Sequence, residues 1–116
     1  MKRIYIAGPY TGGDVAVNVR AAMEAANALI VAGYAPHVPH LYHFLHMANP
    51  RPYEDWMRLD LVWLNQCDAV VRLPGQSPGA DREAVEAVRL GIPVVVVGAH
   101  EDGWVQRLAA LLPRVV

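Results

Sequence analysis

Two carboxylates occupy positions where the surrounding pattern is apolar. Asp60 projects near the middle of the apolar stripe of an expected helix at residues 53–66, and Glu83 lies at the edge of the apolar arc of another. The members of the stripe are Trp56, Leu59, Trp63, Leu64 and Cys67, and those of the arc are Ala80, Ala84, Ala87, Val88 and Gly91. An unpaired carboxylate in apolar surroundings costs on the order of several kcal/mol or takes up a proton. Asp60 is therefore either a structural residue bonded to backbone amides or a site residue with a tuned pKa. Glu83 either complements the helix dipole or is aimed at a site.

The segment before Glu83 has the composition of a ligand-binding joint. An apolar strand is expected at residues 69–73, and a helix at residues 84–91 ends at a glycine. Ser77 suits the N-cap of that helix, and Pro78 suits its first position. In a parallel α/β sheet, such strand–loop–helix joints lie at the carboxyl ends of the strands, where ligands bind. Free backbone N–H groups there favour an anionic or polar ligand.

A second loop with the same placement follows the first expected strand. It reads Gly8-Pro9-Tyr10-Thr11-Gly12-Gly13 and consists mostly of turn formers. Its spacing fits neither a Walker loop nor a dinucleotide-binding fingerprint. The loop is either a flexible turn or, as its position after the strand favours, a backbone-lined wall for a small polar ligand.

Alternating strand and helix patterns predict the fold class. The expected strands lie at residues 2–7, 34–38, 69–73 and 92–97, and the expected helices at residues 15–32, 53–66, 84–91 and 100–112. This order is typical of an α/β protein with a mostly parallel sheet of about four to five strands. We expect a single domain over residues 1–116, a flavodoxin-like or Rossmann-like three-layer sandwich with strand order 2-1-3-4. The ends of the first and third strands are then neighbours, which would bring Tyr5, the residue 8–13 loop, Asp60 and Glu83 together.

Four histidines, from His37 to His46, recur at every third residue. On a helix, this spacing would place His40 and His43 together as metal ligands. No cysteine or acidic cluster accompanies them in the sequence. We therefore favour a pocket-lining segment with one or two polar imidazoles, and we expect neither a metal nor a cofactor. A loop is expected at residues 47–52.

Composition argues against several classes of function. The 116 residues are 54% hydrophobic and 18% charged with a net charge of −1, so nothing draws the chain to nucleic acid or an anionic membrane. No apolar run approaches the roughly 20 residues of a membrane span. The N-terminus lacks the pattern of a signal peptide, and the single cysteine, Cys67, cannot form an internal disulfide. We expect a cytoplasmic protein.

The first expected helix is poor in charge on both sides. The residues that share one face are Asn18, Ala22, Ala25, Ala26 and Leu29. The clearly polar groups of the far side are Arg20, Glu24 and Asn27. Because helices of this composition are often covered on both sides, we expect this helix to take part in a homo-oligomer interface.

Three segments together carry a family resemblance. The first is the opening Ile4-Tyr5-Ile6-Ala7-Gly8-Pro9-Tyr10, and the second consists of residues 60–64 (DLVWL) and 67–71 (CDAVV). The residues of the third are Ser77, Gly79 and Glu83, followed by Ala87, Gly91, Pro93 and Val94. These segments resemble the nucleoside 2-deoxyribosyltransferase family and its nucleotide N-glycosidase relatives, in particular the short bacterial and phage members. In order, they are similar to the family's first strand and substrate loop, to its D-x-x-W-L segment with the strand that follows, and to its nucleophile motif.

This resemblance implies chemistry at the N-glycosidic bond of a nucleoside or its 5′-monophosphate. Glu83 would attack C1′ and form a glycosyl-enzyme, Asp60 would assist the departing base, and Tyr5 would orient the Glu83 carboxylate. An acceptor base would give transfer, and water would give hydrolysis. The residues implied to contact the sugar and its 5′ group are Gly8, Pro9, Tyr10, Gly12, Gly13, Ser77 and Gly79.

Two positions depart from the family pattern. Asp81 stands where the family often has a second glycine. Thr11 stands where nucleotide-cleaving relatives have an arginine, so Arg51 or Arg82 would have to bind a 5′-phosphate instead. The aromatic residues available as walls for a base are Tyr10, Tyr42 and Trp56.

Two other functions stay open. Pro74-Gly75 followed by Glu83 faintly resembles the P-G-G-x-G-T-x-x-E motif of phosphoribohydrolases of the lysine-decarboxylase-like family, without one glycine and the threonine. The other alternative is a nucleoside- or nucleotide-binding protein without turnover, since a fold can keep a site and lose its chemistry.

Overall fold

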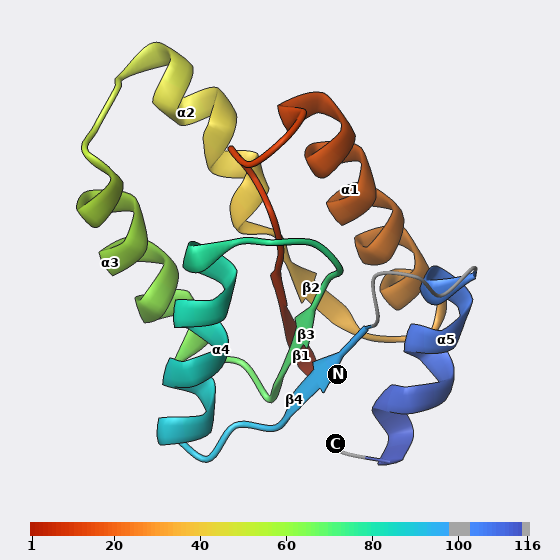
Figure 1. Ribbon diagram of the computed structural model, residues 1–116. Helices are drawn as coiled ribbons and strands as arrows, with labels where there is room; N and C mark the ends of the chain where they lie inside the picture. Colours follow the sequence, from red (N-terminus) through yellow and green to blue (C-terminus); the bar gives the residue numbers. More distant parts are fainter. Residues whose placement is uncertain (98–102, 115–116) are drawn as a thin grey trace.

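The computed structural model describes residues 1–97 and 103–114. Its centre is a four-stranded, all-parallel sheet in the order β2-β1-β3-β4, which confirms the predicted α/β flavodoxin-like fold and strand order (Figure 1). The strands are β1 (Arg3–Ala7), β2 (Ala35–His37), β3 (Ala69–Arg72) and β4 (Val94–Val96). Each is shorter than predicted, by one residue in β1 and β3, two in β2 and three in β4, because an apolar run does not mark the last paired residue.

Helices cover both faces of the sheet. The helical segments are α1 (Val15–Val31), η1 (Pro39–Leu41), α2 (Tyr42–Ala48), α3 (Tyr53–Leu64), α4 (Pro78–Arg89), α5 (Trp104–Leu111) and η2 (Leu112–Arg114). Helices α1 and α5 lie on one face, and α3 and α4 lie on the other (Figure 1). The predicted last helix began at His100, and its first residues, 100–102, lie outside the described residues. In the described part of the chain, no helix has the length and apolar content that a membrane crossing requires.

Helices η1 and α2 were not predicted. The expectation for this part of the chain was a pocket-lining segment and a loop from Met47 onward, but α2 continues through Ala48. None of the α2 residues is buried, so the helix lacks the apolar face whose period would have marked it.

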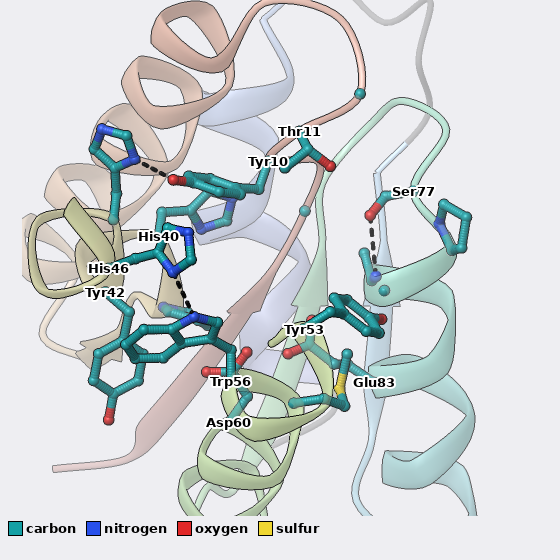
Figure 2. A pocket seen from close by; sticks show the side chains of 18 of the residues that line it. Tyr10, Thr11, His40, Tyr42, His46, Tyr53, Trp56, Asp60, Ser77 and Glu83 are labelled. Carbon is teal, nitrogen blue, oxygen red and sulfur yellow. Dashed lines mark hydrogen bonds between the residues drawn. The ribbon is translucent and has the colours of Figure 1, made fainter. Parts of the chain in front are cut away.

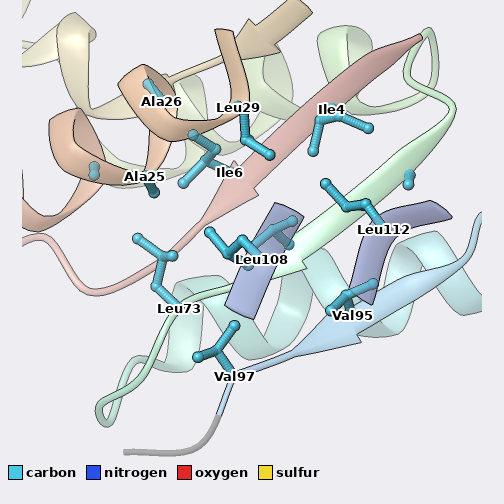
Figure 3. Packing of buried hydrophobic residues seen from close by; sticks show 13 residues of the cluster. Ile4, Ile6, Ala25, Ala26, Leu29, Leu73, Val95, Val97, Leu108 and Leu112 are labelled. Carbon is cyan, nitrogen blue, oxygen red and sulfur yellow. The ribbon is translucent and has the colours of Figure 1, made fainter. Parts of the chain in front are cut away.

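The central strands send alternate side chains to opposite faces. Ile4 and Ile6 of β1 enter the apolar cluster under α1 and α5, whereas Tyr5 and Ala7 enter the cluster under α3 and α4. In the first cluster, α1 and the C-terminal helices meet the sheet (Figure 3). Its helical members are Ala22, Ala25, Ala26, Leu29, Leu108 and Leu112.

Helix α1 is fixed at its start by a side-chain cap. The Asp14 carboxylate accepts hydrogen bonds from the backbone N–H groups of Ala16 and Val17, at 2.8 and 3.3 Å. The predicted inner face is confirmed, because the buried residues are Ala22, Ala25, Ala26 and Leu29. Its exposed sides carry apolar residues such as Ile30, and their place in a homo-oligomer stays a prediction.

The predicted stripe of α3 was wrong in part. Leu64 is buried as expected. Leu59 and Trp63 were also expected in the stripe, but they are 41% and 48% exposed, and Met57 is buried instead. The helix is turned by about one residue relative to the expectation. Part of its apolar surface lines a pocket rather than the sheet.

The predicted arc of α4 also needs correction. Glu83 lies within the buried face, together with Ala80 and Ala87, and not at its edge. Val88, expected in the arc, is 70% exposed. The helix therefore presents a carboxylate, rather than a valine, to the interior.

Candidate functional site

A pocket of about 650 Å³ opens where β1 and β3 end (Figure 2). Its wall combines the loop after β1, the loop after β3 with the start of α4, and residues of η1, α2 and α3. Ligands bind at this place in parallel α/β sheets, and the volume is within the range of small-molecule sites. The predicted site residues that line the pocket are Gly8, Tyr10, Gly12, Asp60, Ser77, Gly79 and Glu83.

Glu83 is the most buried carboxylate of this pocket, with 5% of its surface exposed. Its side chain points from the second turn of α4 toward β1, where the Tyr5 hydroxyl donates a hydrogen bond to Glu83 Oε2. Burial raises the pKa of Glu83 to about 8. The Tyr5 hydrogen bond and the charge of Arg72 oppose that rise, and Asp60 adds to it. Burial, followed by the nearby Glu83 charge, raises the pKa of Tyr5, which therefore stays a phenol donor.

Asp60 faces the same pocket from α3 (Figure 2). Burial raises the pKa of this carboxyl to about 7. Its Oδ1 atom is buried, and among residues 1–97 and 103–114 it has no hydrogen-bond partner. The interpretation of Asp60 as a structural residue required hydrogen bonds from backbone amides, and this oxygen accepts none from the described residues. Near neutral pH, the side chain can therefore carry a proton to donate.

The start of α4 lies inside the pocket. Ser77 Oγ accepts a hydrogen bond from the backbone N–H of Ala80 at 3.1 Å, and Pro78 occupies the first turn, so both predictions are confirmed. Gly79 allows α4 to approach α3, since a Cβ there would lie 3.1 Å from the Tyr53 hydroxyl. The helix N-terminus and the α3 side chains therefore form one continuous wall.

Arg72 fixes the loop between β3 and α4. Its buried guanidinium donates to the carbonyl oxygens of Leu73 and Gly75, the latter at 2.9 Å. It also binds Asp81 Oδ1 at 3.0 and 3.2 Å. Asp81 lies outside the pocket wall. Where nucleoside 2-deoxyribosyltransferases often have a second glycine, this chain therefore has an ion pair that stabilises the loop.

The loop after β1 is held by side-chain hydrogen bonds, which favours the interpretation as a backbone-lined wall over that as a flexible turn. Asn18 Nδ2 donates to the carbonyl oxygens of Tyr10 and Gly12, at 2.9 and 2.7 Å. A Cβ at Gly8 would lie 3.0 Å from the Leu73 side chain, so this loop packs closely against the loop after β3.

Three residues of the predicted site lie outside the pocket wall. Tyr5 lies behind Glu83 and reaches the site through its hydrogen bond. Pro9 turns its carbonyl toward His40 instead. Gly13 has a φ of +79°, so its role is to allow the left-handed turn that leads into α1.

The histidines of residues 37–46 have separate partners. His40 is buried, and its Nε2 lies 2.9 Å from the Pro9 carbonyl. Because a carbonyl only accepts, Nε2 carries the proton. His43 Nδ1 is hydrogen-bonded to the Tyr10 hydroxyl. His40 and His43, the pair considered as metal ligands, thus each contact the loop after β1.

His37 lies outside the pocket wall, unlike the other three. Its ring stacks between those of Tyr5 and Trp63, at centroid distances of 5.6 and 5.3 Å. Of the four histidines, His40, His43 and His46 line the pocket, one more than the one or two imidazoles expected of this segment. Within the described residues, no three His, Cys, Asp or Glu side chains gather in a way that could hold a metal ion.

The aromatic wall is larger than the sequence indicated. Tyr10, Tyr42 and Trp56 line the pocket as expected, and Tyr53 joins them. Other lining residues that the sequence analysis missed are Met57 and Gln76. The missed signal was the spacing on α3, where positions 53, 56, 57 and 60 fall on one helical face.

The two arginines considered for a phosphate differ in their surroundings. Arg82 is excluded, because its guanidinium binds Glu54 through two hydrogen bonds of 2.8 and 3.1 Å, outside the pocket wall. Arg51 lines the pocket, as does Thr11. An anion in the pocket would therefore meet Arg51 and not Arg82.

Comparison with solved structures supports the fold. A 2-deoxyribosyltransferase from the psychrotolerant bacterium Bacillus psychrosaccharolyticus matches with a TM-score of 0.64 and 17% identity. The match covers 86% of this chain and 74% of that chain. That enzyme is described as a biocatalyst for the industrial synthesis of antiviral and antitumoral nucleosides. At this identity, the likeness establishes the fold alone.

Sequence comparison gives a family without an assigned activity. No curated protein matches the chain significantly. The profile of a family described as a domain of unknown function, DUF7768, matches residues 2–97 and so includes β1 through β4 and every residue of the pocket wall. By this match over most of its length, the chain belongs to the DUF7768 family.

Proposed function

We propose that the protein cleaves or transfers at the N-glycosidic bond of a nucleoside or its 5′-monophosphate, with Glu83 as nucleophile and Asp60 as proton donor. The observation that carries the proposal is the buried Tyr5–Glu83 hydrogen bond beside a second carboxylate in one pocket. Two carboxylates in unequal environments are what a retaining glycosidase mechanism requires. The fold shared with a nucleoside-synthesising enzyme supports the same chemistry.

The reaction has two steps. First, the ionised Glu83 carboxylate attacks C1′ while the C1′–N bond breaks. The electron pair of that bond leaves with the base, which takes the proton of Asp60. Second, water or the N–H group of another base attacks C1′, gives its proton to Asp60 and releases Glu83. Water yields a free sugar, and a second base yields a new nucleoside.

The surroundings suit the two roles. Positive charge develops on the sugar in the transition state, and an ionised Glu83 at C1′ stabilises it. Tyr5 and Arg72 favour the ionised form of Glu83. Asp60, with a pKa of about 7, still holds a proton near neutral pH. The active form has Glu83 ionised and Asp60 protonated. Because the pKa of Glu83, about 8, is above that of Asp60, about 7, this form is a minor fraction of the pair near neutral pH.

The test is release of free base from a panel of nucleosides and 5′-monophosphates, with and without a second base. Glu83→Ala is expected to abolish release, and lanes with an acceptor base separate transfer from hydrolysis. Glu86→Ala is the matched control, since Glu86 lies one turn further along α4, pairs with Arg89 and is outside the pocket. It should retain activity.

A covalent intermediate gives a second readout. A 2′-fluoro-2′-deoxynucleoside slows hydrolysis of a glycosyl-enzyme, so the intact mass should rise by one sugar, and peptide mapping should place the adduct on Glu83. Near-normal turnover by Glu83→Ala would refute the nucleophile assignment. Saturable binding of a nucleoside without any base release would favour a binding protein instead.

A further inference from the structure

The outer end of the pocket has a different polarity from the inner end. Asp60 and Glu83 supply carboxylates at the inner end. Arg51 supplies the only Lys or Arg side chain of the pocket wall formed by the described residues. It lies beside Trp56, with its guanidinium carbon 5.6 Å from the indole centroid.

His46 completes this outer end, and its tautomer follows from its partners. The Trp56 indole N–H donates to His46 Nδ1 at 2.8 Å, and the backbone N–H of Arg51 donates to the same atom at 3.3 Å. Both partners can only donate, so Nδ1 holds the lone pair and Nε2 carries the proton. His46 therefore has an N–H donor left to offer a ligand.

Arg51 differs from most other arginines in its pairing. Five other arginines each pair with a carboxylate, whereas no salt bridge of Arg51 occurs within residues 1–97 and 103–114. Its Nη1 donates to the Asn49 carbonyl at 3.2 Å, which restricts the side chain and leaves the rest of the planar donor fork available. A guanidinium beside an N–H donor matches the oxygens of a phosphate or carboxylate.

We infer that Arg51 and His46 form an oxyanion subsite, so that the substrate of the proposed glycosidic chemistry carries an anionic group. The identity of the ligand as a nucleoside derivative rests on the proposed function. The distance between Asp60 and this subsite suits a substrate of that size. Trp56, beside Arg51, lies one helical turn, about 6 Å, from Asp60 along α3. A sugar placed between Asp60 and Glu83 then extends an oxyanion, either a phosphate on the sugar or a carboxylate on the base, toward Arg51.

Binding measured by titration calorimetry tests the subsite independently of turnover. The ligand pairs are thymidine and its 5′-monophosphate, ribose and ribose 5-phosphate, and uridine and its 6-carboxylate, orotidine. We expect the anionic member of at least one pair to bind roughly tenfold to a hundredfold more tightly, the range of a charge-assisted hydrogen bond. The first two pairs indicate a sugar phosphate, and the third indicates an acidic base.

Variants assign that preference to the subsite. Arg51→Gln should abolish it, and His46→Asn, which keeps an acceptor near the position of Nδ1 and removes the Nε2 donor, should weaken it. Arg82→Gln is the matched control, because it changes the net charge equally outside the pocket wall. Melting temperatures check that each variant is folded.

Three outcomes would overturn the inference: equal binding of both members in every pair, equal losses in Arg51→Gln and Arg82→Gln, or no binding at all. The proposed function fails separately. Anion binding without base release would contradict the glycosidic chemistry and leave the subsite standing, whereas base release without anion preference would do the reverse.

Discussion

The two faces of the sheet share the same strands but differ in the polarity of the side chains buried on them. Among the described residues, the face under α1 and α5 buries an apolar cluster of thirteen side chains. The face under α3 and α4 buries a cluster of six, and one of these, Tyr5, makes a hydrogen bond to the buried Glu83. Neighbouring residues of one strand, Ile4 and Tyr5, therefore belong to an apolar core and to a polar site.

This difference separates stability from chemistry. Apolar burial on the α1 and α5 side provides about 25 cal/mol per Å² without polar groups to satisfy. On the α3 and α4 side, burial raises the pKa values of Glu83 and Asp60, which means that the fold disfavours their charged forms. Apolar burial under α1 and α5 therefore offsets the free energy of folding that the buried carboxylates under α3 and α4 cost.

The largest expected effect lies on the polar face. Asp60→Asn should lower kcat/KM for base release about 100-fold to 10,000-fold, the contribution of a positioned general acid. The wild-type pH profile should be bell-shaped with limbs near pH 7 and 8, because the rate needs ionised Glu83 and protonated Asp60. Asp60→Asn should lose the alkaline limb. An unchanged alkaline limb in the variant would remove Asp60 from the role of acid.

On the apolar face, Leu29→Ala should lower stability and leave the rate unchanged. Leu29 is fully buried between α1 and the sheet, and such truncations cost about 2–5 kcal/mol of unfolding free energy. Denaturant titration measures the loss, and kcat/KM per folded molecule should stay unchanged. A rate loss comparable to that of Asp60→Asn would mean that the two faces are not separable.

Glu83→Gln should stabilise the protein, but only above the acid range. The pKa of Glu83 is about 8 in the folded state against an ordinary 4.5, so folded molecules bind more protons between those values. The unfolding free energy of the wild type therefore falls as pH rises from 4.5 to 8. The variant, which keeps an acceptor for Tyr5, should be more stable by a few kcal/mol at pH 8 and similar at pH 4. Equal stability at both pH values would contradict the buried, destabilising carboxylate.

The sequence was most informative where one residue type conflicts with its surroundings. Continuous apolar strands joined by helices leave few topologies, so the strand order was predictable. Asp60 and Glu83 were identified because each interrupts an apolar pattern. The alternation of Ile4 and Tyr5 between faces also follows from strand geometry, but it does not reveal what each face contains.

The outer pocket was not predictable by the same means. Helix α2 has no buried residue, so no hydrophobic period marks it. The predicted orientation of α3 was wrong in part because the side chains that line the pocket and those that meet the sheet are both largely apolar. Only tertiary contacts distinguish the two sets. The partners of His40 and Arg82 lie 31 and 28 residues away in the chain, beyond the reach of local patterns.

The smallest effects compare the helix caps on the two faces. Ser77 caps α4 inside the pocket, and Asp14 caps α1 outside the pocket wall. Replacement of either by Ala removes a side-chain acceptor and should cost about 1 kcal/mol of unfolding free energy. Only Ser77→Ala should also raise KM, because it changes the helix start that the substrate meets. Because both variants should lose the same unfolding free energy, a difference in KM between them reports the effect of Ser77 on substrate binding. Equal KM values would mean that Ser77 only stabilises the helix.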